Sequence, residues 1–328
     1  MALINKLKAI ANAIRSKTNK TEKLTPEQMA SEVSGIDTLQ GLNFEGVFDQ
    51  EQANEINQYY KDGIAYAEEI KRNWGSIDRN KLIYLPGIDL TNITTIANLC
   101  SGCRLLQVIH PINGTSVKTA NNVFYQCSSL VSLNVTLSNA TTLSSFASQC
   151  TSLKKATINA PNNTNLFQAF QSCYNLSEIE LSDMPNVTNY QQAFESTAIK
   201  SINLPTDNAT TLYRTFYTCA QIESIILTSI KKLNSSNAFN NTFAGCTKLI
   251  TLKFREWLKY DISLSNSDKL SAESIDHNIE NAIDKTDGAM DRTLTLHATA
   301  GANWDTNSKY QGEERNLILT QKGIEVTW

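Results

Sequence analysis

The sequence predicts an elongated α/β repeat protein, a solenoid of about seven units whose short strands form one parallel sheet. Two observations predict this fold. Six of the seven cysteines recur at nearly constant spacing, and each is followed by apolar residues in alternation. The composition agrees, because 41% hydrophobic residues in a chain of 328 are enough for a continuous core.

Four segments show the repeat most clearly, and they share the pattern F-x-x-C-x-x-L-x-x-L-x-L with other apolar residues at some leucine positions. They are FYQCSSLVSLNV from Phe124, FQSCYNLSEIEL from Phe170, FYTCAQIESIIL from Phe216 and FAGCTKLITLKF from Phe243. Weaker copies surround Cys103, Cys150 and Thr197, where threonine replaces cysteine and one residue is deleted. We call positions 103, 127, 150, 173, 197, 219 and 246 the markers. They lie 22 to 27 residues apart, within the range of roughly 20–29 residues of leucine-rich repeats.

Each L-x-L segment is expected to be a short strand with alternate side chains pointing inward, such as Leu133 with Val135 or Leu252 with Phe254. Cysteine suits the marker position because it is small, apolar and often buried. Equivalent places in successive units make a disulfide ladder improbable. Cys100 and Cys103 form C-S-G-C, which resembles half a zinc site or a redox pair, although a core position for Cys100 explains it as well.

The pattern divides the chain into four parts. Residues 1–36 are expected to form a helical hairpin for attachment, residues 37–98 a helical linker and N-terminal cap, residues 99–254 the solenoid, and residues 255–328 a small α/β C-terminal cap. One helix of the linker is expected over residues 50–73. In the C-terminal cap we expect a helix near residues 272–284, a strand at 293–297, a polar stretch and a last strand at 324–328. Core closure is the favoured role for three tryptophans of this cap, Trp257, Trp304 and Trp328.

Residues 99–254 resemble the BspA-like leucine-rich repeats of bacterial surface proteins and phage structural proteins. The segment IANAIRSKTNKTEKLTPEQMASEVSGI, residues 10–36, is similar to a segment of tail-associated proteins from phages of Gram-positive hosts. Residues 270–300 are similar to an element that follows such repeats in phage proteins. These resemblances imply a structural protein of a virion, such as a tail fibre, baseplate or receptor-binding subunit, of a phage of Gram-positive or gut bacteria.

Residue chemistry gives little sign of an enzyme. The histidines His110, His277 and His297 fall in different predicted elements without metal-ligand spacing, and carboxylates are scattered. The sequence has no Gly-rich phosphate loop, no G-x-S-x-G and no H-E-x-x-H motif. We therefore expect no catalytic residues, no cofactor and no metal. A net charge of -3 disfavours nucleic acid, and no apolar run is long enough for membrane insertion.

The open face of the strands is the predicted partner-binding face, because stacked repeats make a broad, regular surface there. Its outward residues are Asn134, Thr157, Glu180, Asn203, Ile226 and Lys253. This mixed, mostly polar row suits a host-surface carbohydrate or protein, although a solvated or subunit-covered face is the favoured interpretation.

Two functions remain open: an adhesin that engages the host envelope, or a purely architectural virion part such as a head decoration. A bacterial surface adhesin is a third. Other virion proteins are expected partners through the N-terminal helices, and a homo-oligomer is expected. The opening MALINKLKAIANAIRSK lacks a secretory cleavage site, so synthesis in the host cytoplasm is expected. This fits the place in the virion that the resemblances imply.

Overall fold

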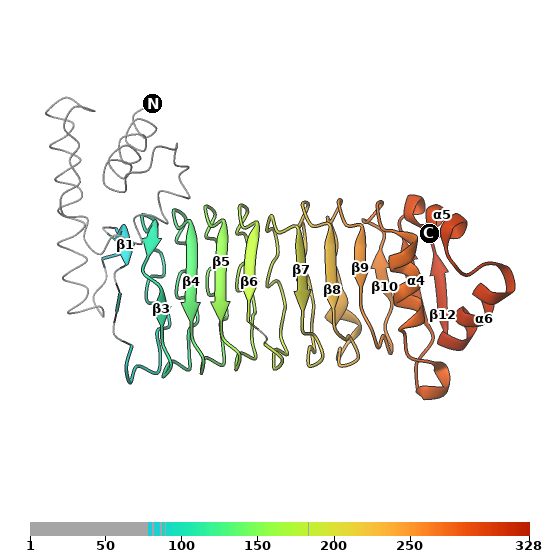
Figure 1. Ribbon diagram of the computed structural model, residues 1–328, viewed down its shortest axis with the longest axis horizontal. Coiled ribbons are helices and arrows are strands. Elements are labelled where there is room, and N and C mark those ends of the chain that lie inside the picture. The colour runs from blue at the N-terminus through green and yellow to red at the C-terminus, as the bar shows by residue number, and fades with distance from the viewer. Residues whose placement is uncertain (1–77, 81, 86, 89, 183) are drawn as a thin grey trace, which may run out of the picture.

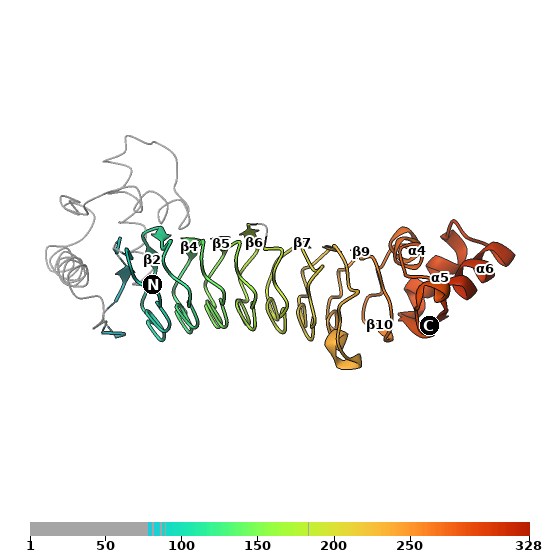
Figure 2. The ribbon, with the colours of Figure 1, turned by 90° about the horizontal axis from the view of Figure 1, so that it is seen from below.

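The computed structural model describes residues 78–80, 82–85, 87–88, 90–182 and 184–328 (Figure 1). The helices expected within residues 1–36 and 50–73 lie outside these residues. Over the described part, the chain winds into a parallel-strand solenoid of about seven turns, as the repeat predicts. Figure 2 shows the solenoid from a second side, with the strands β4 to β7 along one edge.

All strand pairs of the solenoid are parallel, so the strands of successive turns lie side by side. The strands are β1 (Tyr84–Leu85), β2 (Val108–Ile109), β3 (Ile112–Asn113), β4 (Ser132–Thr136), β5 (Lys155–Asn159), β6 (Glu178–Leu181), β7 (Ser201–Leu204), β8 (Ser224–Leu227) and β9 (Thr251–Lys253). A 3-10 helix η2 (Ser236–Phe239) occupies the longer connection before β9.

Two left-handed residues bend the chain in every turn, at the positions one and five residues before the marker. Left-handed backbone is unfavourable for residues other than glycine, so its recurrence marks a required bend. The positions before the marker are Gly102, Gln126, Gln149, Ser172, Ser196, Thr218 and Gly245; the earlier ones are Asn98, Asn122, Ser145, Gln168, Gln192, Arg214 and Asn241. The unit of Thr197 therefore keeps the same backbone bends as its neighbours.

Backbone hydrogen bonds join successive turns on the side opposite the strands as well. Phe124 N donates to Phe146 O at 2.8 Å, and Phe170 N donates to Ala193 O at 2.9 Å. A column of parallel bridges runs beside them through Thr95, Thr119, Thr142, Asn165, Asn189 and Thr211. Two sides of each turn are thus hydrogen-bonded to the next, which satisfies most of the backbone without helices.

The core consists of columns of identical side chains. The rings of Phe170, Phe194, Phe216 and Phe243 stack at centroid distances of 5.9, 5.8 and 6.2 Å, and all are buried. All seven cysteines are buried free thiols. Such columns give each turn most of its stabilising contacts from its two neighbours.

The expectation of one unbroken sheet is wrong at two places. β1 and β2 form one sheet, β3 to β6 a second and β7 to β9 a third, with no pairing between β6 and β7 in the described residues. We attribute the break between β6 and β7 to the deletion in the Thr197 unit, where β7 begins four residues after the marker instead of five. Beside the break, Ile179 and Leu181 are only half-buried, unlike inward residues of the other strands.

The C-terminal cap is richer in helix than the sequence indicated. Its elements are β10 (Ile262–Leu264), α4 (Ala272–Glu280), η3 (Lys285–Asp287), β11 (Arg292–Leu296), α5 (Ala298–Asn307), α6 (Gly312–Lys322) and β12 (Ile324–Thr327). β10, β11 and β12 form a parallel sheet. The expected polar stretch is in fact two helices, α5 and α6. Although the surface of α5 is polar, its Ala300 and Trp304 pack inward. β10 was not predicted.

Helix α4 closes the exposed edge of β9. Ser274 and Asn278 are buried, and their side chains bond to backbone groups of the strand as another strand would. Asn278 accepts from Phe254 N at 3.0 Å and donates to Leu252 O at 3.0 Å. Ser274 Oγ accepts from Leu252 N at 3.2 Å. Unpaired sheet edges invite further pairing, and this helix removes that possibility.

Two of the three cap tryptophans close the core as expected. Trp257 and Trp304 are buried, whereas Trp328 is half exposed. Trp328 nevertheless packs edge-on against Trp304 at 6.0 Å. It also lies over Gly301, where a Cβ atom would meet its ring at 2.3 Å.

Candidate functional site

The predicted partner-binding face consists of two shorter rows. Asn134, Thr157 and Glu180 are in register across β4, β5 and β6. Asn203, Ile226 and Lys253 are in register across β7, β8 and β9. The break between β6 and β7 separates the rows. Four of the six side chains are exposed, while those of Thr157 and Lys253 are half-buried.

Charges on the first row are paired with neighbours on the same face. Lys155 Nζ lies 3.2 Å from Glu180 and 3.6 Å from Glu178, and Thr157 Oγ1 donates to Glu180 at 3.2 Å. These bonds lower the pKa of the Glu180 carboxyl, and the Glu180 bond raises the pKa of Lys155. Both side chains are solvent-exposed, so the pairs add little stability. They place the Glu180 carboxylate beside Lys155 and Thr157.

The second row is less polar and ends on an ion pair. Lys253 Nζ lies 2.8 Å from Glu273 in α4, and this bond lowers the pKa of Glu273. Ile226 is 39% exposed, and Ile250 beside the start of β9 is 46% exposed. The two rows therefore differ: an ion-paired polar row before the break, and a row with exposed isoleucine after it.

Sequence reasoning missed Lys155 and Glu178. They stand two residues before Thr157 and Glu180 and point to the same face, with Lys155 paired to Glu178 in register. Alternation along the strands could have found both, because residues two apart share a face.

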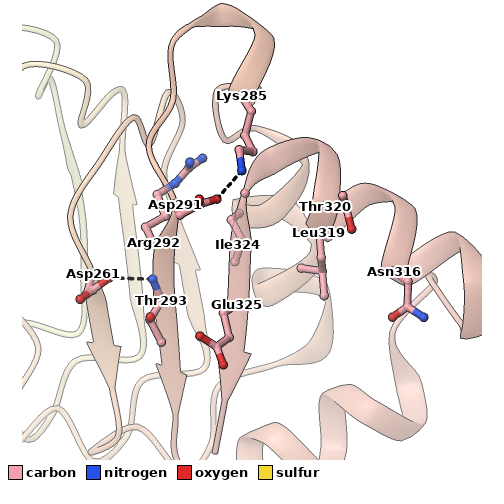
Figure 3. Close-up of a pocket in the computed structure, with 11 residues that line it drawn as sticks. Asp261, Lys285, Asp291, Arg292, Thr293, Asn316, Leu319, Thr320, Ile324 and Glu325 are labelled. Atoms are coloured by element: carbon pink, nitrogen blue, oxygen red, sulfur yellow. Dashed lines mark hydrogen bonds and ion pairs between the residues drawn. The ribbon is translucent and has the colours of Figure 1, made fainter.

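A pocket of about 550 Å³ opens in the cap between α6 and the starts of β11 and β12 (Figure 3). Its charged groups are largely engaged. Asp291 pairs with Lys285 at 2.7 Å, and Asp261 accepts from Thr293 N at 2.7 Å. The buried Arg292 donates to three backbone carbonyl groups, and burial lowers its pKa to about 10. These contacts hold the cap together.

The three histidines lie apart from one another. His110 follows β2, His277 lies in α4, and His297 caps α5 by accepting from Thr299 N at 3.1 Å. Within the described ranges, no group of three or more His, Cys, Asp or Glu side chains could hold a metal ion. The same ranges contain no helix with the length and apolarity needed to span a bilayer.

Comparison with known proteins gives one family match. The family described as BspA type Leucine rich repeat region matches residues 92–223 and 168–283, in six copies. A leucine-rich repeat protein of solved structure from Bacteroides ovatus ATCC 8483 is 12% identical, over 76% of this chain and 84% of that chain, at a TM-score of 0.25. No curated protein matches the sequence.

Proposed function

Because the chain belongs to the BspA-type leucine-rich-repeat family, we propose that it is a non-enzymatic, adhesin-like protein that recognises a cell surface through its strand face. The row Asn134, Thr157 and Glu180 carries the proposal. Its three side chains stand in register on adjacent strands, and Lys155 pairs with Glu180 on the same face. A regular surface on a hydrogen-bonded sheet suits an extended partner, because the backbone loses little conformational entropy on binding.

In this proposal the protein is a component of a bacteriophage particle, such as a tail fibre or baseplate subunit. The support comes from the similarity of residues 10–36 and 270–300 to segments of phage tail-associated proteins. Residues 1–36 then dock onto other virion proteins, and the solenoid faces the host envelope. The protein acts from the virion as a homo-oligomer, on a host-surface carbohydrate or protein.

Binding to intact cells tests the recognition role. Labelled full-length protein is titrated onto candidate host cells, with and without soluble wall polysaccharide as competitor. Saturable binding that the competitor removes is expected. Absence of saturable binding at any accessible concentration contradicts the proposal and leaves an architectural role.

Variants then locate the binding surface. The double substitution Asn134→Arg with Asn203→Arg places bulky charge on both exposed rows, and we expect at least tenfold weaker cell binding. Asn186→Arg is the matched control, because Asn186 is exposed but lies outside the strands. Equal loss in the control would argue against the strand face.

A purely architectural virion component is the second candidate. Deletion of residues 1–36 separates the two. Incorporation into particles fails under both, but the shortened protein still binds host cells only if the solenoid is an adhesin. If the protein is instead a bacterial surface adhesin, deletion leaves cell binding intact and no particle incorporates the full chain.

A further inference from the structure

The side of the solenoid opposite the strands has an unusual composition. We call it the turn face: the positions one, two, five and six residues before each marker, in all seven turns. Amides, hydroxyls and aromatic rings occupy most of these positions, and all of them belong to the described part of the chain. None holds lysine, leucine, isoleucine, valine or methionine. The charged residues there, Glu195 and Arg214, pair with each other at 3.0 Å.

Aromatic and polar side chains gather in the middle of this face. The turns of Cys173, Thr197 and Cys219 contribute a patch that we call the turn-face patch: Phe167, Gln191, Glu195, Tyr213, Arg214 and Tyr217. All but Glu195 are half-buried. The aromatic rings of Phe167, Tyr213 and Tyr217 thus pack partly against the solenoid and remain partly accessible to solvent.

The backbone fixes the spacing of the patch. Gln192 N donates to Tyr213 O at 2.9 Å, and Ser196 N donates to Tyr217 O at 2.8 Å. These bonds hold adjacent turns in register, so that Gln191 is beside Tyr213 and Glu195 beside Tyr217. Strand-like stacking separates such neighbours by about 4.8 Å. The side chains of the patch therefore repeat at the spacing of the turns.

Side-chain hydrogen bonds fix the polar groups as well. Gln168 Nε2 donates to Gln192 Oε1 at 3.2 Å, and Gln192 Nε2 donates to Glu195 Oε2 at 2.8 Å. Arg214 donates to Glu195 Oε1 at 3.0 Å and stacks on the Tyr217 ring, with its guanidinium carbon 3.9 Å from the ring centroid. This chain of contacts crosses three turns. Groups ordered in advance lose little entropy when a ligand binds.

We infer that the turn-face patch binds a neutral, hydroxyl-rich polysaccharide. Two observations favour this ligand. The lack of lysine and the internal Glu195–Arg214 pair disfavour a polyanion. The half-buried Gln191 carries an amide that can hydrogen-bond sugar hydroxyls, while Tyr213 and Tyr217 can stack on the C–H faces of sugar rings.

This site goes beyond the strand-face recognition proposed above and does not depend on it. It lies on another side of the solenoid and uses other residues. A chain that binds both ways could engage a wall glycan on one face while the strand face meets a different part of the cell surface.

Affinity electrophoresis of the full-length protein tests the site. Native gels contain dextran, yeast mannan or laminarin as neutral polysaccharides, and polygalacturonate as the anionic comparison. Retardation by at least one neutral polysaccharide is expected, without retardation by polygalacturonate. The proposal is overturned if none of the three retards the protein, or if polygalacturonate alone does.

Substitutions locate the binding. Tyr217→Ala is expected to weaken retardation at least tenfold, whereas Tyr217→Phe keeps the ring under Arg214 and is expected to retain most of it. Tyr213→Ala provides a second variant that leaves the Arg214 contacts intact, and thermal melts verify that each variant folds. Unchanged retardation in both alanine variants overturns the site.

The strand-face variant Asn134→Arg with Asn203→Arg distinguishes this site from the proposed function. It should keep polysaccharide retardation while its cell binding weakens at least tenfold. Loss of retardation in this variant, with full retention in Tyr217→Ala, would refute the turn-face site and leave the cell-surface role standing. Retardation without any cell binding would refute the cell-surface role and leave the turn-face site standing.

Discussion

The thiol of Cys150 donates a hydrogen bond of 3.0 Å to the carbonyl oxygen of Phe124, one turn earlier in the solenoid. The same carbonyl accepts the backbone N–H of Cys127 at 3.0 Å. Equivalent thiol bonds of 3.0 to 3.2 Å recur at the other markers from Cys127 onward that hold cysteine. The marker cysteine is therefore more than a small apolar filler, because it also links adjacent turns.

Removing one of these thiols should destabilise the solenoid. Cys150→Ala deletes a buried sulfur and its bond to Phe124 O, and we expect the free energy of unfolding to fall by about 1–3 kcal/mol. Urea unfolding followed by circular dichroism measures the change.

Cys150→Thr is the informative comparison. In the natural Thr197 unit the hydroxyl donates at 2.9 Å to Phe194 O of its own turn, so threonine can occupy a marker. We expect Cys150→Thr to cost less than Cys150→Ala. If alanine unfolds at the same urea concentration as the wild type, the thiol bond adds nothing to stability.

The cysteine column should also make stability fall at alkaline pH. Burial raises the pKa of Cys173 to about 12 and that of Cys219 to about 11, against about 8.5 in an unfolded chain. Between these values the unfolded state has lost the protons that the folded state retains. Each thiol then lowers the free energy of unfolding by about 1.4 kcal/mol per pH unit.

Urea unfolding at pH 8, 9, 10 and 10.5 checks this slope. The loss should be small below pH 8 and should grow between about pH 9 and 11. The double variant Cys173→Ala with Cys219→Ala is less stable at neutral pH but should show a shallower decline. Parallel curves for the two proteins would mean that other groups cause the alkaline loss.

Much of this fold could be predicted from the sequence, because the spacing of the repeats gives the length of each turn. The marker spacing and the inward alternation of Leu133 with Val135 predict turns, strands and core together. The left-handed bends could not be predicted, because residues as different as Gln149, Ser172 and Gly245 all take this conformation. The break in the sheet was missed for a related reason: the deletion beside Thr197 was visible, but its effect on pairing depends on the geometry of β6 and β7.

Sequence periodicity predicts less of the C-terminal cap and of the candidate site. α5 and α6 carry almost no apolar periodicity, and their packing depends on single residues such as Trp304. The outward row could be predicted from alternation alone. The bonds that fix Glu180, and the turn-face patch, depend on contacts between units that one unit's sequence does not reveal.

Substitution by alanine should destabilise the protein to different extents at two glycines that occupy equivalent positions in different turns. Gly102 and Gly245 both precede a marker, with φ of 78° and 83°. A Cβ at Gly245 would lie 3.0 Å from the Thr218 backbone, whereas at Gly102 its nearest neighbour is the side-chain Cδ of Arg79 at 3.6 Å. We expect Gly102→Ala to cost about 1 kcal/mol from backbone strain alone, and Gly245→Ala about 2–3 kcal/mol.

Thermal melts of the two variants measure that difference. Because both lose the same conformational freedom, the gap between them reports the contact with Thr218. Equal melting temperatures would show that the turn at Gly245 shifts to accommodate the methyl group.

The side chain of Asn278 should be essential to the closed edge of β9. Asn278→Ala leaves Phe254 N and Leu252 O buried without their partner, and each such group costs about 1–3 kcal/mol. We expect the free energy of unfolding to fall by roughly 2–4 kcal/mol and the Phe254 amide to exchange with solvent much faster. Hydrogen exchange followed by mass spectrometry of peptides spanning residues 250–256 measures the local opening. Asn281→Ala is the matched control, because the Asn281 side chain bonds His277 O within its own helix. If both variants leave exchange at Phe254 unchanged, the edge of β9 is protected by the body of α4 and not by the asparagine that imitates a strand.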